Sequence, residues 1–235
     1  MNIQNSVALV TGANRGLGQA YVRALLAAGA KKVYAAARDP STITLEGVER
    51  IALDVTDPTS VAAAAALAKD VTILINNAGI SRGSTFLAAD SASAARAEFE
   101  TNFFGPLATS QAFAPVLKAN GGGAIVNVLS VLSWLNLTSA ATYSASKSAA
   151  WSLTNGLRNE LRGQGTQVVA VHVGFMDTDM TAKIDGPKLN PADVAKYTLE
   201  VLAGGGEEVL ADELSRNVKA GLSAQPGVYL GAVGG

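Results

Sequence analysis

The sequence predicts a doubly wound α/β fold, a parallel sheet of about seven strands with helices on both faces. Two observations support this prediction. Short apolar runs alternate with alanine-rich stretches of helical length along nearly the whole chain. Several of these runs are apolar throughout, as strands buried on both faces of a parallel sheet should be. Because no linker rich in proline, glycine or serine and no run of charges interrupts the 235 residues, we expect a single domain.

The apolar runs predict strands at 6–11, 32–36, 48–53, 71–75, 124–129, 167–173 and 207–210. The stretches between them predict helices near 17–28, 58–68, 91–118, 144–162 and 191–203. Gly204-Gly205-Gly206 fits a tight turn before the last strand. Over 212–235 we expect a short helix followed by a loose, glycine-rich tail.

The composition excludes several classes of function. A net charge of −1 gives no attraction to nucleic acid or to an anionic membrane. The absence of cysteine excludes disulfides and thiolate sites, and with only one histidine we expect no metal site. Residues 1–6 are polar, and no apolar run approaches the ~18 residues of a membrane span. We therefore expect a cytoplasmic protein without nucleic-acid or membrane partners.

A glycine-rich turn, Thr11-Gly12-Ala13-Asn14-Arg15-Gly16-Leu17-Gly18, joins the first strand to the first helix. Glycines there let the backbone turn sharply and approach a pyrophosphate, which then lies at the helix N-terminus. The spacing differs from G-x-G-x-x-G because three residues separate the first two glycines. Any tight strand-to-helix turn can use glycine, but the position on the first strand of a βαβ unit favours a dinucleotide-binding Rossmann fold.

The residues that end the second strand indicate which dinucleotide binds. Ala37 stands where an acidic side chain would hold the ribose hydroxyls, and Arg38 follows it. Arg15, inside the glycine turn, could reach the same place, and two cations there favour the 2′-phosphate of NADP(H) over NAD(H). Asp39 could instead pair with Arg38, which would weaken this preference and leave NAD(H) possible.

Two more strand ends carry candidate cofactor residues. After the third strand, Asp54-Val55 could meet the adenine ring, with Asp54 accepting from its amino group. Asp54 could also merely cap the next helix, although Asp57 or Thr56 suits that cap better. The fourth strand runs into Asn76-Asn77-Ala78-Gly79, whose small residues leave room for a flat ligand.

Tyr143 and Lys147 are four residues apart in a predicted helix and therefore project from the same face. A phenol titrates near pH ~10, and a cation beside it lowers that pKa toward the neutral range. Taken alone, the pair could equally be part of a solvated helix surface.

Together these motifs resemble the short-chain dehydrogenase/reductase family in its compact single-domain form. The glycine turn, Asn76-Asn77-Ala78-Gly79 and Tyr143-x-x-x-Lys147 match the motifs of that family in order and spacing. Ser130 lies thirteen residues before Tyr143, where the family keeps its catalytic serine, and Asn102 opens a long helix where the family keeps an asparagine. The resemblance covers about residues 6–180.

The chain departs from the family pattern in two places. Where the family has Pro-Gly-x-x-x-Thr, this chain has Val173-Gly174-Phe175-Met176-Asp177-Thr178. Gly174 and Thr178 are retained and can still meet the nicotinamide. The loop loses the fixed φ that proline would give it. The usual Asp-Gly-Gly ending is missing, which puts a tetramer built on C-terminal strands in doubt. The helices after Asn102 and Tyr143 commonly form a dimer seam in the family, so we expect a homodimer or homotetramer.

The resemblance implies reversible hydride transfer between a nicotinamide cofactor and a carbonyl or alcohol. Tyr143 is the expected general acid or base, and Lys147 is expected to lower its pKa and bind the nicotinamide ribose. Ser130 would orient the substrate oxygen, and Asn102 would hold the helix geometry and a water linking Lys147 to solvent. Individually, Ser130 could be a strand-end hydroxyl, Asn102 a cap and Lys147 a surface charge. The expected cofactor residues are Gly12, Asn14, Arg15, Gly16, Leu17, Gly18, Arg38, Asp54, Val55, Asn76, Ala78, Gly79, Tyr143, Lys147, Gly174 and Thr178.

The substrate is expected to be a hydrophobic ketone or aldehyde. Its pocket should be walled by Val131, Leu132, Trp134 and Leu135 after Ser130, and by Phe175, Met176 and the segment to Asn190. His172 lies in a run of valines and is expected to be a core residue rather than a base. The alternatives are a non-catalytic NADP(H)-binding sensor or scaffold and an NAD-linked alcohol dehydrogenase.

Overall fold

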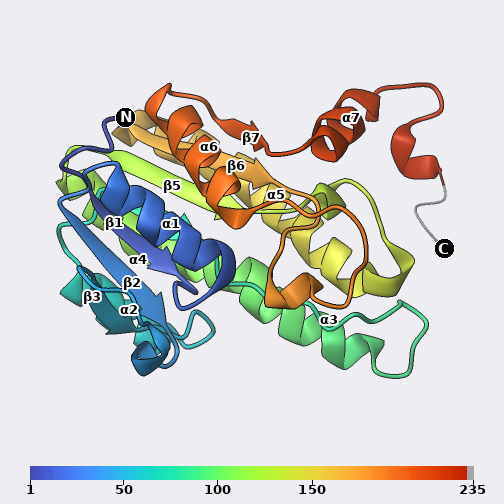
Figure 1. The fold of residues 1–235 in the computed structure, drawn as a ribbon, viewed down its shortest axis with the longest axis horizontal. Helices are drawn as coiled ribbons and strands as arrows, with labels where there is room; N and C mark the ends of the chain where they lie inside the picture. Colours follow the sequence, from blue (N-terminus) through green and yellow to red (C-terminus); the bar gives the residue numbers. More distant parts are fainter. Residues whose placement is uncertain (232–235) are drawn as a thin grey trace.

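The computed structural model describes residues 1–231, and these contain a seven-stranded, wholly parallel sheet (Figure 1). The strand order is β3-β2-β1-β4-β5-β6-β7, so the order reverses between β1 and β4, where doubly wound sheets bind ligands. The predicted fold and all seven strands are confirmed, with ends shifted by one or two residues. The strands are β1 (Val7–Thr11), β2 (Lys32–Ala37), β3 (Glu49–Ala52), β4 (Ile73–Asn76), β5 (Gly123–Val128), β6 (Thr166–His172) and β7 (Glu208–Leu210).

Helices cover both faces of the sheet and bury a core on each side. Leucine, valine and alanine side chains of α1 and α6 pack against one face, where these two helices lie side by side (Figure 1). Apolar side chains of α2, α4 and α5, among them the fully buried Phe113, pack against the other face. The bounds are α1 (Gly16–Ala27), α2 (Pro58–Leu67), α4 (Gly105–Ala119), α5 (Ala141–Leu161) and α6 (Pro191–Ala203).

The helix predicted over 91–118 is divided by a π-helical turn. α3 (Ser91–Phe99) continues into this turn, Glu100–Phe104, and then into α4. A π-turn adds one residue to the helical repeat, and Asn102 lies at its centre. Asn102 is therefore inside a continuous helix and does not open one, which corrects the prediction from the sequence.

The C-terminal segment forms the predicted short helix, α7 (Glu213–Gly221), and then a 3-10 turn at Val228–Leu230. α7 lies beyond the end of β7 (Figure 1), and Val218 on this helix packs against Trp134. Residues 232–235 of the predicted tail lie outside the described residues. Within residues 1–231, no helix is long and apolar enough to cross a membrane, and no group of histidine and carboxylate side chains could hold a metal ion.

Candidate active site

The four predicted catalytic residues come together where β4 and β5 end. Ser130 follows β5, Tyr143 and Lys147 lie in the first two turns of α5, and Asn102 lies in the π-turn between α3 and α4. Asn102, Ser130 and Lys147 are buried, and Tyr143 is half-buried. Residues from three segments that are far apart in the sequence therefore share one partly enclosed site.

Asn102 ties the segment after β4 to the helix that carries Tyr143. Its Oδ1 accepts from the Ile80 backbone N–H at 2.9 Å, and its Nδ2 donates to the Ile80 carbonyl and to Ser146 Oγ, each at 2.9 Å. Ser146 Oγ in turn donates to the Tyr143 carbonyl at 2.7 Å. Both amide hydrogens of Asn102 are thus used within the protein. Sequence reasoning missed Ser146, although it lies between Tyr143 and Lys147 in the motif.

Lys147 is directed at the sheet. Its Nζ donates to the Val128 carbonyl at 2.8 Å, just beyond the last residue pair between β4 and β5. The same nitrogen is 5.7 Å from the centre of the Tyr143 ring, and a Cβ added to Gly79 would lie 3.7 Å from it. Burial lowers the pKa of Lys147 to about 8. This amine is therefore close to its titration range at physiological pH.

Burial raises the pKa of Tyr143 to about 12, the Ser130 hydroxyl opposes this shift, and the Glu98 carboxylate adds to it. The prediction that Lys147 lowers the pKa of Tyr143 is not met in this geometry, because desolvation dominates and the ammonium is bonded to Val128. Tyr143 is consequently protonated at neutral pH, as a general acid must be before it donates. Glu98 is fully buried, and its Oε1 accepts from the Arg82 N–H at 2.7 Å.

Ser130 begins a short 3-10 turn, Val131–Ser133, directly after β5. Its Oγ accepts from the Leu132 N–H at 3.1 Å, which fixes the direction of the side chain. A hydroxyl that accepts one hydrogen bond can still donate its own hydrogen. Ser130 can therefore offer a donor to an oxygen placed next to Tyr143.

The glycine turn has the shape that a pyrophosphate needs. Gly12 and Gly16 adopt φ values of +64° and +52°, in the left-handed region that favours glycine. A Cβ added to Gly18 would lie 2.1 Å from the Gly12 carbonyl oxygen, so no larger residue fits at this close approach. Arg15 precedes α1 in extended conformation without capping it, which leaves the first-turn N–H groups for an anion.

Two residues that sequence reasoning missed hold this turn against β4. Thr11 Oγ1 accepts from the backbone N–H groups of Asn77 and Ala78, each at 3.0 Å. Asn77 Nδ2 donates to the carbonyls of Thr11 and Gly12 at 2.9 Å and 3.2 Å. Both residues belong to the quoted motifs, so their position was a usable signal.

The side chains of two expected cofactor residues point into the protein. Asn76 is buried, its Nδ2 donates to Asn127 Oδ1 at 2.8 Å, and its Oδ1 accepts from Thr109 Oγ1 at 2.7 Å. Leu17 is part of the core on the α1 face. The side chains of both residues are used inside the fold, so only their backbone is available to a cofactor.

One of the two arginines expected at the 2′-phosphate is held in an ion pair. Arg15 Nη1 lies 2.6 Å from Asp179 Oδ2, and both side chains are largely exposed. Asp39 accepts from the N–H and Oγ of Ser41 at 2.9 Å and 2.7 Å, and within residues 1–231 it forms no ion pair with Arg38. The Arg38 side chain is exposed directly after β2.

Asp57, and not Asp54, caps the helix that follows. Asp57 accepts from the Thr59 N–H at 2.9 Å and caps α2, as predicted. Asp54 Oδ1 accepts from the N–H and Oγ1 of Thr56 at 2.9 Å and 2.7 Å. The second carboxylate oxygen of Asp54 is left to accept from an adenine amino group. Val55, which follows Asp54, packs against Gly105 of α4.

The segment after β6 approaches the glycine turn. A Cβ added to Gly16 would lie 3.3 Å from the Thr178 methyl group, so Thr178 and the start of α1 are neighbours. The Gly174 N–H donates to Asp212 Oδ2 at 2.6 Å, and Asp212 Oδ1 accepts from the Ser215 N–H at 2.6 Å. Asp212, which sequence reasoning missed, thus anchors this segment to α7. The segment after β6 is thus in contact with the glycine turn at Thr178 and Asp179.

The predicted substrate walls need correction. Trp134 and Leu135 are buried in a small core with Val218, because the chain after Ser130 turns toward α7. The apolar side chains that remain accessible lie after β6, where Phe175 is 38% and Met180 is 53% exposed. Among the predicted walls, the exposed large apolar side chains therefore belong to the 175–190 segment.

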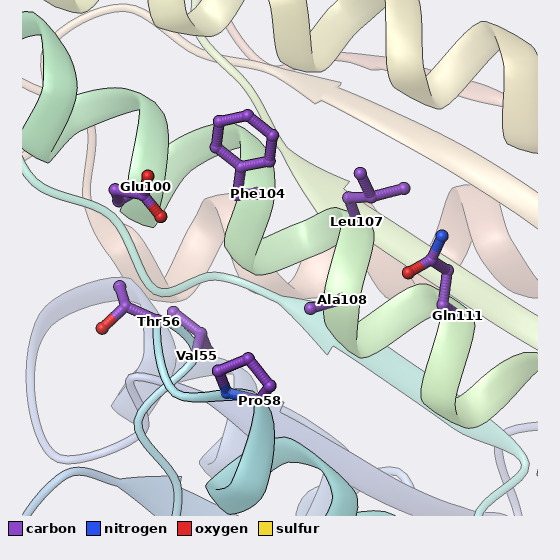
Figure 2. A pocket seen from close by; sticks show the side chains of 8 residues that line it. All are labelled: Val55, Thr56, Pro58, Glu100, Phe104, Leu107, Ala108 and Gln111. Atoms are coloured by element: carbon purple, nitrogen blue, oxygen red, sulfur yellow. The ribbon is translucent and has the colours of Figure 1, made fainter.

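A surface groove between α2 and α4 contains none of the four catalytic residues (Figure 2). Phe104, which is 46% exposed, and Leu107 line it from the helix side, and Pro58 lines it at the start of α2. The groove lies on the helix that the sequence analysis assigned to the dimer seam.

Comparison with known proteins identifies the family. Residues 6–188 match the family described as short chain dehydrogenase. The chain belongs to this family. A structure of a short-chain dehydrogenase from Burkholderia cenocepacia in complex with NADP is 43% identical, has a TM-score of 0.92 and shares 96% of each chain. One from Burkholderia phymatum in complex with NAD is 25% identical, has a TM-score of 0.85 and matches 100% of this chain and 99% of its own.

Two relatives of this short-chain dehydrogenase are named for chemically different substrates. Galactitol 2-dehydrogenase (L-tagatose-forming) of Cereibacter sphaeroides is 37% identical over 77% of this chain and 76% of its own. The 3-oxoacyl-(acyl-carrier-protein) reductase of Vibrio cholerae is 31% identical over 79% of both chains. Membership of the family therefore leaves the substrate open.

Proposed function

We propose that this chain is an NADP(H)-dependent reductase that converts the carbonyl group of a hydrophobic ketone or aldehyde into an alcohol. The observation that carries the proposal is the meeting of Ser130, Tyr143 and Lys147 beside Gly79, next to a glycine turn shaped for a pyrophosphate. A protein that only sensed the nucleotide would need the turn but not this buried set of proton-handling side chains.

In the proposed mechanism, the bound nicotinamide supplies or accepts the hydride. Tyr143 donates its phenolic proton to the oxygen of the carbonyl as negative charge develops there, and takes it back in the oxidative direction. Ser130 donates a hydrogen bond to the same oxygen and orients it toward the phenol. Lys147, whose Nζ lies 5.7 Å from the centre of the Tyr143 ring, would bind the ribose of the cofactor. Asn102 acts through Ser146, by holding the turn of α5 that carries Tyr143.

The preference for NADP(H) rests on Arg38 at the end of β2, where no acidic side chain takes the place of Ala37. The complex of the Burkholderia cenocepacia relative with NADP supports this assignment. The pairing of Arg15 with Asp179 weakens it, because one of the two cations is engaged elsewhere. We expect NADPH to be preferred and NADH to be accepted.

The proposed substrate class follows from the accessible side chains after β6. Phe175 and Met180 present apolar surface, and Leu132 is half-buried next to Ser130. We also propose that the chain forms a homodimer or homotetramer through α4 and α5, with the exposed Phe104 in the contact.

The test is a spectrophotometric panel of aromatic and aliphatic ketones, aldehydes and polyols, run separately with NADPH and NADH. The proposal expects NADPH oxidation with apolar carbonyl compounds and a lower kcat/KM with NADH. Oxidation of polyols with NAD as the main activity would favour an NAD-linked alcohol dehydrogenase. Binding of NADPH without turnover of any compound would favour a sensor or scaffold. Size-exclusion chromatography with light scattering tests the oligomer.

A further inference from the structure

His172, the single histidine of the chain, lies at the end of β6 and is fully buried. Its Nδ1 is 3.2 Å from the carbonyl oxygen of Ser130. A carbonyl can only accept, so Nδ1 must carry the hydrogen and donate it. The same oxygen accepts from the Ser133 N–H at 3.0 Å, so the two donors occupy both of its lone pairs.

Aromatic side chains hold the imidazole in this orientation. The Trp134 ring stacks on it with a centroid separation of 3.8 Å and an interplanar angle of 18°. Trp151 packs edge-on against Trp134, with centroids 6.1 Å apart and the rings at 86°. A ring clamped in this way cannot turn about its Cβ–Cγ bond without displacing Trp134.

The charged groups facing the imidazole leave it neutral. His172 Nε2 is 3.8 Å from Glu208 Oε1, which is too long for a hydrogen bond, and it has no hydrogen-bond partner within residues 1–231. Glu208 is paired with Lys219 of α7, and Arg158 of α5 is a second cation acting on the ring. Burial lowers the pKa of His172 to about 4, so neutral imidazole with hydrogen on Nδ1 is the form at physiological pH.

We propose that His172 is a positioning residue for the catalytic serine. By donating to the Ser130 carbonyl, it fixes the peptide that starts the 3-10 turn and so the direction of Ser130 Oγ. This inference rests on the proposed function, since Ser130 matters only if a carbonyl is reduced. The N–H of the same peptide, that of Val131, donates to the Val173 carbonyl at 3.0 Å, so the imidazole is one of three contacts that hold this peptide, together with the Val131 and Ser133 N–H groups.

The test uses two amide substitutions that differ in where they place the donor. In His172→Asn the amide nitrogen replaces Nδ1 and can reach the Ser130 carbonyl, whereas in His172→Gln it lies near the former Nε2. We expect His172→Asn to keep kcat within about 3-fold and His172→Gln to lose at least ~10-fold, with the Kd for NADPH unchanged in both. Equal kcat values in the two variants would overturn the inference.

A double mutant separates positioning from general packing. If His172 acts through Ser130, the variant Ser130→Ala/His172→Gln should be no slower than Ser130→Ala alone, because the side chain being positioned is already gone. A multiplicative loss would mean that His172 only supports the fold, and this would overturn the inference.

Nitrogen NMR of the single imidazole tests the contact without any substrate. We expect the Nδ1–H tautomer and no titration between pH 5 and pH 8. An Nε2–H tautomer overturns the inference even if the enzyme is active. A wild-type protein without turnover overturns the proposed function instead, so the two failures are distinguishable.

Discussion

Asn102 and Ile80 exchange two hydrogen bonds of 2.9 Å each, the side-chain amide pairing with the backbone N–H and carbonyl of Ile80. Through Ser146, Asn102 also reaches the Tyr143 carbonyl. The π-turn between α3 and α4 presents this side chain to both partners. The geometry of the acid is thereby linked to the segment that follows the cofactor motif Asn76–Gly79.

Asn102→Ala should therefore reduce both stability and turnover. It leaves the half-buried N–H and carbonyl of Ile80 without their side-chain partner, which costs about 1 kcal/mol of unfolding free energy for each hydrogen bond lost. Ser146→Ala is the matched control, because it removes the hydrogen bonds between Asn102, Ser146 and the Tyr143 carbonyl but keeps those between Asn102 and Ile80. We expect Ser146→Ala to lower kcat with a smaller loss of stability, measured by urea unfolding beside steady-state kinetics. Full activity in Asn102→Ala would show that the hydrogen bonds from Asn102 through Ser146 to Tyr143 are not needed for turnover.

The lowered pKa of Lys147 predicts a pH-dependent stability. The folded chain holds this amine at a pKa of about 8, against about 10.4 for an unfolded lysine. Between these values the unfolded chain binds more protons, so the free energy of unfolding should rise with pH by up to about 1.4 kcal/mol per unit. Lys147→Met should lose this rise, as followed by denaturant unfolding from pH 7 to pH 10. An unchanged slope would show that the amine does not titrate there.

The Arg15–Asp179 pair predicts a change in cofactor preference. Asp179→Asn should release Arg15 toward the 2′-phosphate and tighten NADPH binding about 2- to 5-fold, the size expected of an exposed ion pair. NADH affinity should stay constant, because NADH lacks that phosphate. Asp177→Asn is the control, since Asp177 has no ion pair within residues 1–231. Fluorescence titration gives both Kd values, and equal changes for NADPH and NADH would reject the prediction.

Gly18→Ala tests the close approach in the glycine turn. A methyl group there would lie 2.1 Å from the Gly12 carbonyl oxygen, so the turn must open and the pyrophosphate cradle is lost. We expect NADPH affinity to fall at least ~10-fold, since a glycine turn binds through its backbone geometry. Gly163→Ala is the control, because a Cβ at Gly163 meets nothing within 4 Å. Unchanged binding by Gly18→Ala would place the dinucleotide elsewhere.

Features with a local signature were predictable from the sequence. The seven strands were visible as apolar runs, and the glycine turn and Tyr143-x-x-x-Lys147 as short motifs whose spacing has a physical reason. Features set by contacts between distant segments were not. Trp134 is buried by Val218 of α7, 84 residues away, and Arg15 pairs with Asp179, 164 residues away. The π-turn at Asn102 is a local insertion that has no sequence signature.

The effect of Lys147 on the pKa of Tyr143 was also not predictable from the sequence, because it depends on burial and on contacts with distant segments. The i, i+4 spacing correctly put Tyr143 and Lys147 on one face, but it could not show that burial outweighs the attraction between them. The spacing also could not reveal that the Val128 carbonyl takes the ammonium, because that contact depends on where β4 ends.

The central claim is that Tyr143 is the general acid of a carbonyl reduction. Single-turnover reduction by Tyr143→Phe, with NADPH affinity measured in the same samples, tests it most directly. We predict an unchanged Kd for NADPH and a loss of at least ~10²-fold in the rate of the chemical step, because the ring remains while its proton is removed. A variant that binds NADPH and reduces the substrate at the wild-type rate would contradict the account.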